Sequence, residues 1–218
     1  GRPAPAYRAR AIRRRHRAAW HAARRVCAKS DLKRANRLDR PDRMILDLDP
    51  DPDLSWKRVI EGAQLTKALL KSLGLVSFVK TTGGKGIHIV IPLRRTKGWE
   101  EVKSFSKRVA EHLAHVIPSL FTSVMAKRAR RGKIYVDYLR NAQGATAVAS
   151  YSTRARSGAP VSVPLTWEEL SREISPHRFT IRNLHERLQQ LRQDPWVDYP
   201  KVKQSISADM VARLRLKP

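Results

Sequence analysis

The apolar run Met44–Leu46 is followed at once by two acids that a single leucine separates, Asp47-Leu48-Asp49. A short apolar run of this kind predicts a buried strand. Residues two apart on a strand share a face and lie roughly 7 Å apart along it, so both carboxylates should point to one side while Leu48 enters the core. Carboxylate oxygens are the ligands that magnesium and manganese prefer. The segment therefore predicts a strand end that can bind divalent cations.

Asp137 is the candidate for a third metal ligand, because it is the only acid in the strand-like segment Lys133–Leu139. Two metal ions roughly 3.5–4 Å apart can activate an attacking oxygen and stabilise the leaving one, and two carboxylates alone hold such a pair poorly. Other interpretations stay open at this point. An Asp-x-Asp followed by Asp-Pro can be a plain strand terminus, and a single acid near a strand end is commonly solvated or salt-bridged.

A glycine-rich turn, Thr82-Gly83-Gly84-Lys85-Gly86-Ile87-His88, joins two strand-like runs, Leu75–Lys80 and Ile87–Leu93. Its glycines allow positive φ and a close approach to a ligand, and successive backbone amides in such a turn can bind an anion. Lys85 and His88 add charge or hydrogen-bond donors. The spacing of a Walker A loop is absent. The turn is thus a candidate phosphate site, with an ordinary hairpin turn as the alternative.

The charge of the chain favours a polyanionic partner. Its 218 residues contain 45 Lys and Arg against 19 Asp and Glu, a formal net charge of +26. Nucleic acid is the expected partner, with binding that weakens as salt rises. A membrane surface is the rival, but no apolar stretch approaches the roughly 18 residues of a membrane span, so no membrane partner is expected. The single cysteine, Cys27, excludes an internal disulfide and fits a reducing bacterial cytoplasm.

Positive charge is concentrated at the amino terminus. Residues 1–30 contain nine Arg and Lys29 and no acid, and they show no clear apolar period. We expect residues 1–27 to be a disordered or out-of-frame segment, and an authentic basic arm that binds nucleic acid is the alternative. A second basic cluster, Lys127–Lys133, directly precedes the Asp137 strand. It is expected to be a loop that is either solvated or in contact with phosphates.

The remaining pattern alternates helices and strands. Apolar spacing predicts a helix over Trp56–Leu73, with Ser55 as its N-cap and Gly74 as its stop, and another over Trp99–Ile117. Further strands are predicted over Ala145–Ser150 and Val161–Val163, and short helices over Trp167–Leu170 and Asn183–Leu191.

The order Asp-x-Asp, glycine turn with histidine, then a third Asp resembles the archaeo-eukaryotic primase superfamily. The surrounding residues are similar to the polymerase domain of bacterial ligase D, from about Ala28 to Val197. Thr82 stands where that family usually has Ser, which keeps the hydroxyl. The segments that carry the resemblance are Arg40–Pro50, Phe78–His88, Tyr135–Asn141, Gly144–Ala149 and Tyr151–Pro160.

The resemblance implies an α/β (α+β) fold, with a mainly antiparallel central sheet flanked by helices, over residues 28–218. Relative to the family, this domain is expected to be truncated at its amino terminus. It also implies a two-metal nucleotidyl transfer with two Mn²⁺ or Mg²⁺ ions as cofactors. The catalytic and metal-binding residues would be Asp47, Asp49 and Asp137.

The same resemblance implies a site for a nucleoside triphosphate. The expected nucleotide-binding residues are Thr82, Gly84, Lys85, His88, Arg140 and Arg154. Arginine suits such a site because its planar guanidinium donates paired hydrogen bonds to phosphate at any working pH. The implied partners are DNA ends, nucleoside triphosphates, the end-binding Ku protein and a ligase module, in non-homologous end joining in the bacterial nucleoid. A preference for manganese and for ribonucleotides is implied as well.

Two other classes of function stay open on the sequence. The chain can be a catalytically inactive, truncated fragment that only binds nucleic acid. It can also be another Asp-x-Asp enzyme, such as a phosphatase or a glycosyltransferase. Asp51 counts against a phosphatase of the haloacid type, because that motif has Thr or Val two residues after its second Asp.

Overall fold

The structure is a computed structural model that describes residues 38–170 and 174–214. Its centre is a six-stranded sheet in the order β4-β5-β1-β3-β2-β6. All pairs are antiparallel except β4 with β5, which confirms the predicted mainly antiparallel sheet. The strands are β1 (Arg43–Pro50), β2 (Phe78–Thr81), β3 (Ile87–Pro92), β4 (Phe121–Thr122), β5 (Ile134–Asp137) and β6 (Pro164–Leu165).

Strand β1 separates the core from the site by simple alternation. Met44, Leu46 and Leu48 are 0% exposed and join the hydrophobic core. Asp47 and Asp49 lie on the opposite face and are partly buried. This confirms the predicted strand and its two faces. Because β1 lies between β3 and β5, both acids are in the middle of the sheet rather than at its edge.

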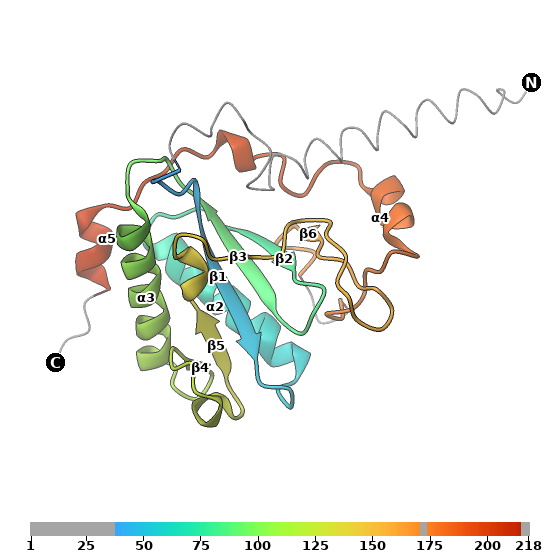
Figure 1. Cartoon of the computed structure of the whole chain (residues 1–218), viewed down its shortest axis with the longest axis horizontal. Helices are drawn as coiled ribbons and strands as arrows, with labels where there is room; N and C mark the ends of the chain where they lie inside the picture. Colours follow the sequence, from blue (N-terminus) through green and yellow to red (C-terminus); the bar gives the residue numbers. More distant parts are fainter. Residues whose placement is uncertain (1–37, 171–173, 215–218) are drawn as a thin grey trace, which may run out of the picture.

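Two long helices pack on the sheet, α2 (Trp56–Ser72) behind it and α3 (Trp99–Val116) along its β4–β5 side (Figure 1). Both were predicted. Helix α2 begins after Ser55, although the Ser55 hydroxyl makes no capping bond, and ends before Gly74, whose φ of 80° reverses the chain. Gly62 brings α2 so close to β5 that an added Cβ would lie 2.4 Å from the Ile134 side chain.

Three predicted elements are wrong. Residues 145–150 form no strand, because this segment bonds to side chains rather than to a neighbouring strand. Within the predicted strand Val161–Val163, Val161 makes one isolated bridge to Thr153, and the strand β6 begins only at Pro164. Residues 167–169 form a turn instead of a helix.

The carboxyl-terminal part wraps back over the sheet (Figure 1). Trp196 is 3% exposed, donates its indole N–H to the Val79 carbonyl and stacks on Tyr199. No helix of residues 38–170 and 174–214 is long and apolar enough to cross a membrane. The predicted segment 1–27 lies outside the described residues. The remaining helices are α4 (Leu184–Gln190), α5 (Ala208–Arg213) and the 3₁₀ turns η2 (Lys127–Arg130), η3 (Leu139–Asn141) and η4 (Tyr199–Lys201).

Candidate active site

Four ionisable residues lie in one row across the sheet. Lys80 on β2 is the register partner of His88 on β3, His88 is the partner of Asp47 on β1, and Asp47 is the partner of Asp137 on β5. Register partners have side chains on the same face, at roughly 4.5–5.5 Å between Cβ atoms. The pairing therefore brings two of the predicted metal ligands together from distant parts of the sequence.

Arg140 bridges these two acids. Its Nε lies 3.1 Å from Asp137 Oδ2 and 3.4 Å from Asp47 Oδ2, and its Nη1 donates to the Thr146 carbonyl at 3.3 Å. The next residue, Asn141, fixes η3 by exchanging 2.8 Å bonds with both the N–H and the carbonyl of Ile45 on β1. The side-chain amide of Asn141 thus bonds to β1 as a neighbouring strand would. It fixes the turn that places Arg140 between the acid pair and Thr146.

The two acids of the pair have opposite pKa shifts. Burial alone would raise the pKa of Asp47, but the hydrogen bond from His88 and the charges of His88, Arg140 and Lys80 together lower it. Burial, with the negative charge of Asp47 adding to it, raises the pKa of Asp137, against the 2.9 Å bond from the Leu139 N–H and the charge of Arg140. The single guanidinium of Arg140 cannot fully neutralise two carboxylates that lie this close together. A divalent cation between them would lower both pKa values.

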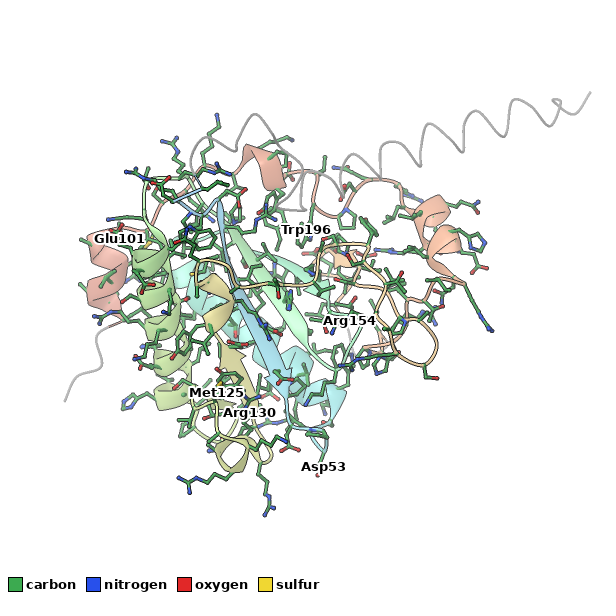
Figure 2. All side chains as sticks on the ribbon, viewed as in Figure 1. Asp53, Glu101, Met125, Arg130, Arg154 and Trp196 are labelled. Carbon is green, nitrogen blue, oxygen red and sulfur yellow. The ribbon has the colours of Figure 1, made fainter. Side chains whose placement is uncertain are left out.

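Asp49 lies two residues along β1 and has its own cations. Its Oδ1 is 3.4 Å from Lys85 Nζ, and its Oδ2 is 2.9 Å from Arg130 Nη1. Arg130 stacks over the Tyr135 ring at 3.9 Å and donates to the Met125 carbonyl, which lies beside it at the η2 end of the molecule (Figure 2). The basic cluster at 127–133 therefore reaches the site through Arg130.

The glycine turn is built around the Thr82 hydroxyl. This oxygen accepts the Gly84 N–H at 3.2 Å and donates to the Gly86 carbonyl at 3.0 Å, which closes the turn between β2 and β3. Gly83 has φ of 64°, where glycine is favoured. Gly86 has no room for a side chain, because an added Cβ would lie 2.5 Å from the Leu48 carbonyl of β1. The turn therefore lies directly against the strand that carries the acids.

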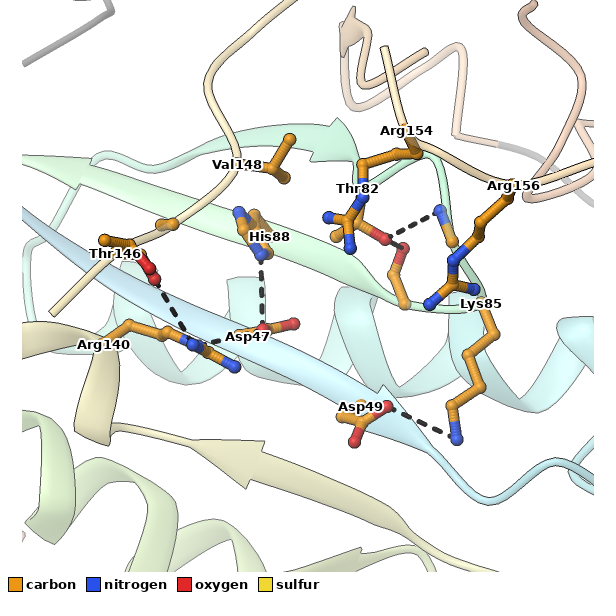
Figure 3. Close-up of a pocket in the computed structure, with 13 residues that line it drawn as sticks. Asp47, Asp49, Thr82, Lys85, His88, Arg140, Thr146, Val148, Arg154 and Arg156 are labelled. Atoms are coloured by element: carbon orange, nitrogen blue, oxygen red, sulfur yellow. Dashed lines mark hydrogen bonds and ion pairs between the residues drawn. The ribbon is translucent and has the colours of Figure 1, made fainter. Parts of the chain in front are cut away.

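A pocket of about 470 Å³ opens between the acids, the glycine turn and residues 146–156 (Figure 3). Arg154 and Arg156 line it and point their guanidinium groups into it. In the described part of the chain, neither forms an ion pair with an acid. Lys85 and Arg140 line the same space but are bound to Asp49 and Asp47. The pocket thus offers two unpaired positive charges to an anion.

His88 is bound to Asp47 rather than turned freely toward the pocket. Its Nε2 lies 3.4 Å from Asp47 Oδ2, and its side chain is 3% exposed. Burial, the charge of Lys80 and that of Arg140 lower the pKa of His88 in spite of its interaction with Asp47. Its Nδ1 has no hydrogen-bond partner among the described residues. His88 therefore contributes to the site through its interaction with Asp47.

The pocket brings together nearly all the residues that the sequence singled out. Asp47, Asp49 and every predicted nucleotide-binding residue line it, whereas Asp137 reaches the site through Arg140. Other residues also line it, among them Arg156, which the sequence indicated less firmly than Arg154. Most of them present backbone or small side chains, which carry no chemical signal in a sequence. They are Gly86, Thr146, Ala147, Val148 and Arg156.

The carboxylates of the three acids have the oxygen chemistry that divalent metal ions prefer. Asp47 and Asp137 face each other and share the guanidinium of Arg140. Their carboxylate oxygens suit the coordination of a hard metal ion. Asp49 would have to exchange Lys85 and Arg130 for a metal ion. Within the described residues, no three His, Cys, Asp or Glu side chains converge closely enough to hold a metal ion together. The two-ion arrangement therefore stays a prediction.

Comparison with known proteins identifies the family. The family model described as LigD, primase-polymerase domain, matches residues 11–196. The chain belongs to this family. It is 52% identical over 178 residues to the multifunctional non-homologous end joining protein LigD of Pseudomonas aeruginosa, covering 81% of this chain and 21% of that protein. It is 35% identical over 150 residues to the bifunctional LigD of Bacillus subtilis, covering 68% of this chain and 24% of that protein.

A solved structure supports the same assignment. The polymerase domain from Mycobacterium tuberculosis ligase D in complex with DNA matches with a TM-score of 0.65 at 33% identity, over 69% of this chain and 52% of that chain. The chain thus spans about half of that domain and about a fifth of the Pseudomonas LigD protein. The family match starts at residue 11, inside the basic segment 1–27, whose origin stays a prediction.

Proposed function

We propose that this LigD-family chain catalyses template-directed nucleotidyl transfer during DNA end joining. A primer 3′-hydroxyl attacks the α-phosphate of a nucleoside triphosphate, a new phosphodiester bond forms, and pyrophosphate leaves. The observation that carries this proposal is the acid pair Asp47 and Asp137 beside a pocket with two unpaired arginines in the described structure. Acids beside unpaired cations are what a metal-bound triphosphate requires.

The pocket residues have distinct roles in this reaction. Arg154 and Arg156 bind the triphosphate, because their guanidinium groups meet no acid in the described structure and suit paired phosphate oxygens. The glycine turn adds backbone amides around Thr82, and Lys85 lies at its edge. Arg140, between the acids and Thr146, orients the end of the triphosphate nearest the metal site. Catalysis then consists mainly of positioning and charge neutralisation.

Asp47, Asp49 and Asp137 are the residues that would hold two Mn²⁺ or Mg²⁺ ions. When bound, the ions would neutralise the α-phosphate and favour ionisation of the 3′-hydroxyl. The raised pKa of Asp137 supports this role, because burial disfavours its ionised form and a bound cation would favour it. Manganese and ribonucleotides are the preferred ion and substrate in this proposal.

DNA ends are the proposed macromolecular partner. The solved relative is in complex with DNA, and this chain has a formal net charge of +26. The cluster Lys127–Lys133 lies next to Asp49 through Arg130, where a primer backbone could contact it. Ku and a ligase module are the proposed protein partners in end joining.

Primer extension with Mn²⁺ and each nucleoside triphosphate tests the proposal. Asp47→Ala and Asp137→Ala should each lower the rate of nucleotide addition by roughly a thousandfold, because each removes an oxygen ligand at the centre of the site. Binding of the same DNA should change little, since it depends on Lys and Arg. Asp198→Ala is the matched control, because Asp198 is exposed and does not line the pocket.

Two results would contradict the proposal. Primer extension by Asp47→Ala at the wild-type rate would show that the acid pair has no role in the reaction. A wild-type chain that binds DNA ends but adds no nucleotide under any metal would instead support a fragment that only binds nucleic acid.

A further inference from the structure

Lys80 is a buried lysine that the proposed reaction does not use. Its side chain is 2% exposed, and in the described part of the chain it has no carboxylate within ion-pair distance. Its Nζ donates to the Val148 carbonyl at 2.6 Å and to Ser162 Oγ at 2.8 Å. Burying an amine without an acid is unfavourable, and these two hydrogen bonds offset part of that cost.

The first acceptor belongs to the wall of the pocket. Residues 146–148 line the pocket but form no strand. In the described structure, two side-chain hydrogen bonds join this wall to the rest of the site. Arg140 binds the Thr146 carbonyl at one end, and Lys80 binds the Val148 carbonyl at the other.

The second acceptor is at the base of the hairpin that carries the unpaired arginines. Ser162 donates its N–H to Ser152 at 3.0 Å, and Arg154 donates its N–H to Pro160 at 2.8 Å, so the two sides of this hairpin are paired. Ser162 Oγ also donates to the Thr81 carbonyl of β2 at 2.7 Å. Val148 and Arg154 lie on the side of the pocket opposite Asp47 (Figure 3).

We propose that Lys80 is a positioning residue for the nucleotide pocket. Its single amine joins both the wall at residues 146–148 and the hairpin at residues 152–162, which carries Arg154 and Arg156, to β2. The inference rests on the proposed function, because it assigns the role of Lys80 to triphosphate binding. An amine has at least two N–H groups in either protonation state, so both acceptors are satisfied with or without the charge.

Lys80→Met tests the tether, because it keeps the length and apolar body of the side chain and removes both hydrogen bonds. Lys107→Met is the matched control, since it removes the same charge from an exposed position on α3. In primer extension, Lys80→Met should raise KM for the nucleoside triphosphate about tenfold and change kcat less than about threefold. Hydrogen exchange of the amides in residues 144–156 should become faster than in wild type. Lys107→Met should match wild type in all three measurements.

Ser162→Ala keeps the test decisive if Lys80→Met fails to fold. It removes one Lys80 acceptor together with the Ser162 bond to Thr81, and it leaves the Lys80 bond to Val148. KM should therefore rise by a smaller factor, and exchange should increase mainly in residues 151–156. Unchanged KM in both variants, or a fall in kcat at constant KM, would overturn the positioning role. A wild-type chain that adds no nucleotide would refute the proposed function instead, and hydrogen exchange would still report whether the tether exists.

Discussion

Asp47 occupies the centre of the site because three strands meet at its register position. His88 and Asp137 are its partners on the two sides, and Arg140 reaches it from the turn after β5. A carboxylate in this position is buried, yet its pKa is lowered, because cationic and hydrogen-bonding groups surround it. The residue is therefore ionised well below neutral pH.

The unpaired arginines should govern affinity for the triphosphate. Arg154→Ala should weaken nucleoside triphosphate binding by about 10–100-fold, because a charge-assisted hydrogen bond contributes about 1.5–3 kcal/mol. Binding of the parent nucleoside should change much less, since it has no phosphate to meet the guanidinium. Titration calorimetry with both ligands measures the two effects. Arg108→Ala is the control, because Arg108 is exposed on α3. Equal losses for both ligands would place Arg154 at the sugar or the base.

The buried lysine predicts a pH dependence of stability. Burial lowers the pKa of Lys80 to about 7, with Asp47 opposing the shift and Arg154 and Arg43 adding to it. Between pH 7 and the ordinary value of 10.5, the unfolded chain binds a proton here that the folded chain does not. This residue therefore makes the free energy of unfolding rise with pH in that window, by at most about 1.4 kcal/mol per unit. Below pH 7 the lysine is protonated in both the folded and the unfolded chain, so burial of its charge lowers the free energy of unfolding by its full amount.

Lys80→Met should lack this contribution. The difference in free energy of unfolding between Lys80→Met and wild type, measured in urea, should be most favourable to the variant near pH 7. It should shift toward wild type as the pH rises to the ordinary lysine value of 10.5. Parallel curves for the two proteins would show that Lys80 keeps its proton in the folded chain across the window.

At the scale of elements, the glycine turn and β1 form one unit because Gly86 touches the Leu48 carbonyl. Gly86→Ala should lower the free energy of unfolding by about 1–3 kcal/mol, since the added Cβ would clash with a backbone carbonyl that cannot rotate away. It should also weaken triphosphate binding, because the turn must shift. Gly98→Ala is the control, where an added Cβ meets only Glu101 at 3.8 Å. Urea unfolding measures the first effect, and equal stability of the two variants would contradict the tight packing.

The elements with local signals were predictable, and those that depend on distant partners were not. The alternation in β1 and the apolar period of α2 lie within the sequence of each element, and both predictions are confirmed. Residues 145–150 have strand-like composition but bond to Lys80 and Arg140, which no local pattern can reveal. The same reason hid Lys80, because a lysine in a strand is usually exposed.

Site residues show the same division. The glycine turn and Asp-x-Asp were recognisable because their residue types carry the chemistry. Their assembly with Asp137 depended on strand register between segments far apart in the sequence, so the local pattern offered Asp137 only as a candidate and the family resemblance strengthened it. The unpaired state of Arg154 and Arg156 in the described structure could not be predicted either, because it depends on which acids lie near them in space.

For the whole molecule, the uneven charge decides how nucleic acid binding should respond to truncation. Residues 1–27 contain nine Arg and no acid, and they lie outside the described residues, whereas the hydrophobic core is formed within the described part of the chain. Deleting residues 1–27 should change the melting temperature of the remainder by no more than about 2 °C, because a core that already buries its apolar groups supplies the stability. Non-specific affinity for DNA should fall, and the slope of log K against log salt should become shallower by about 0.9 for each phosphate that the shortened chain no longer neutralises. Thermal unfolding and salt titrations of the 218-residue chain and the shortened chain measure both effects. A shortened chain that no longer folds would show instead that the basic segment is an integral part of the domain.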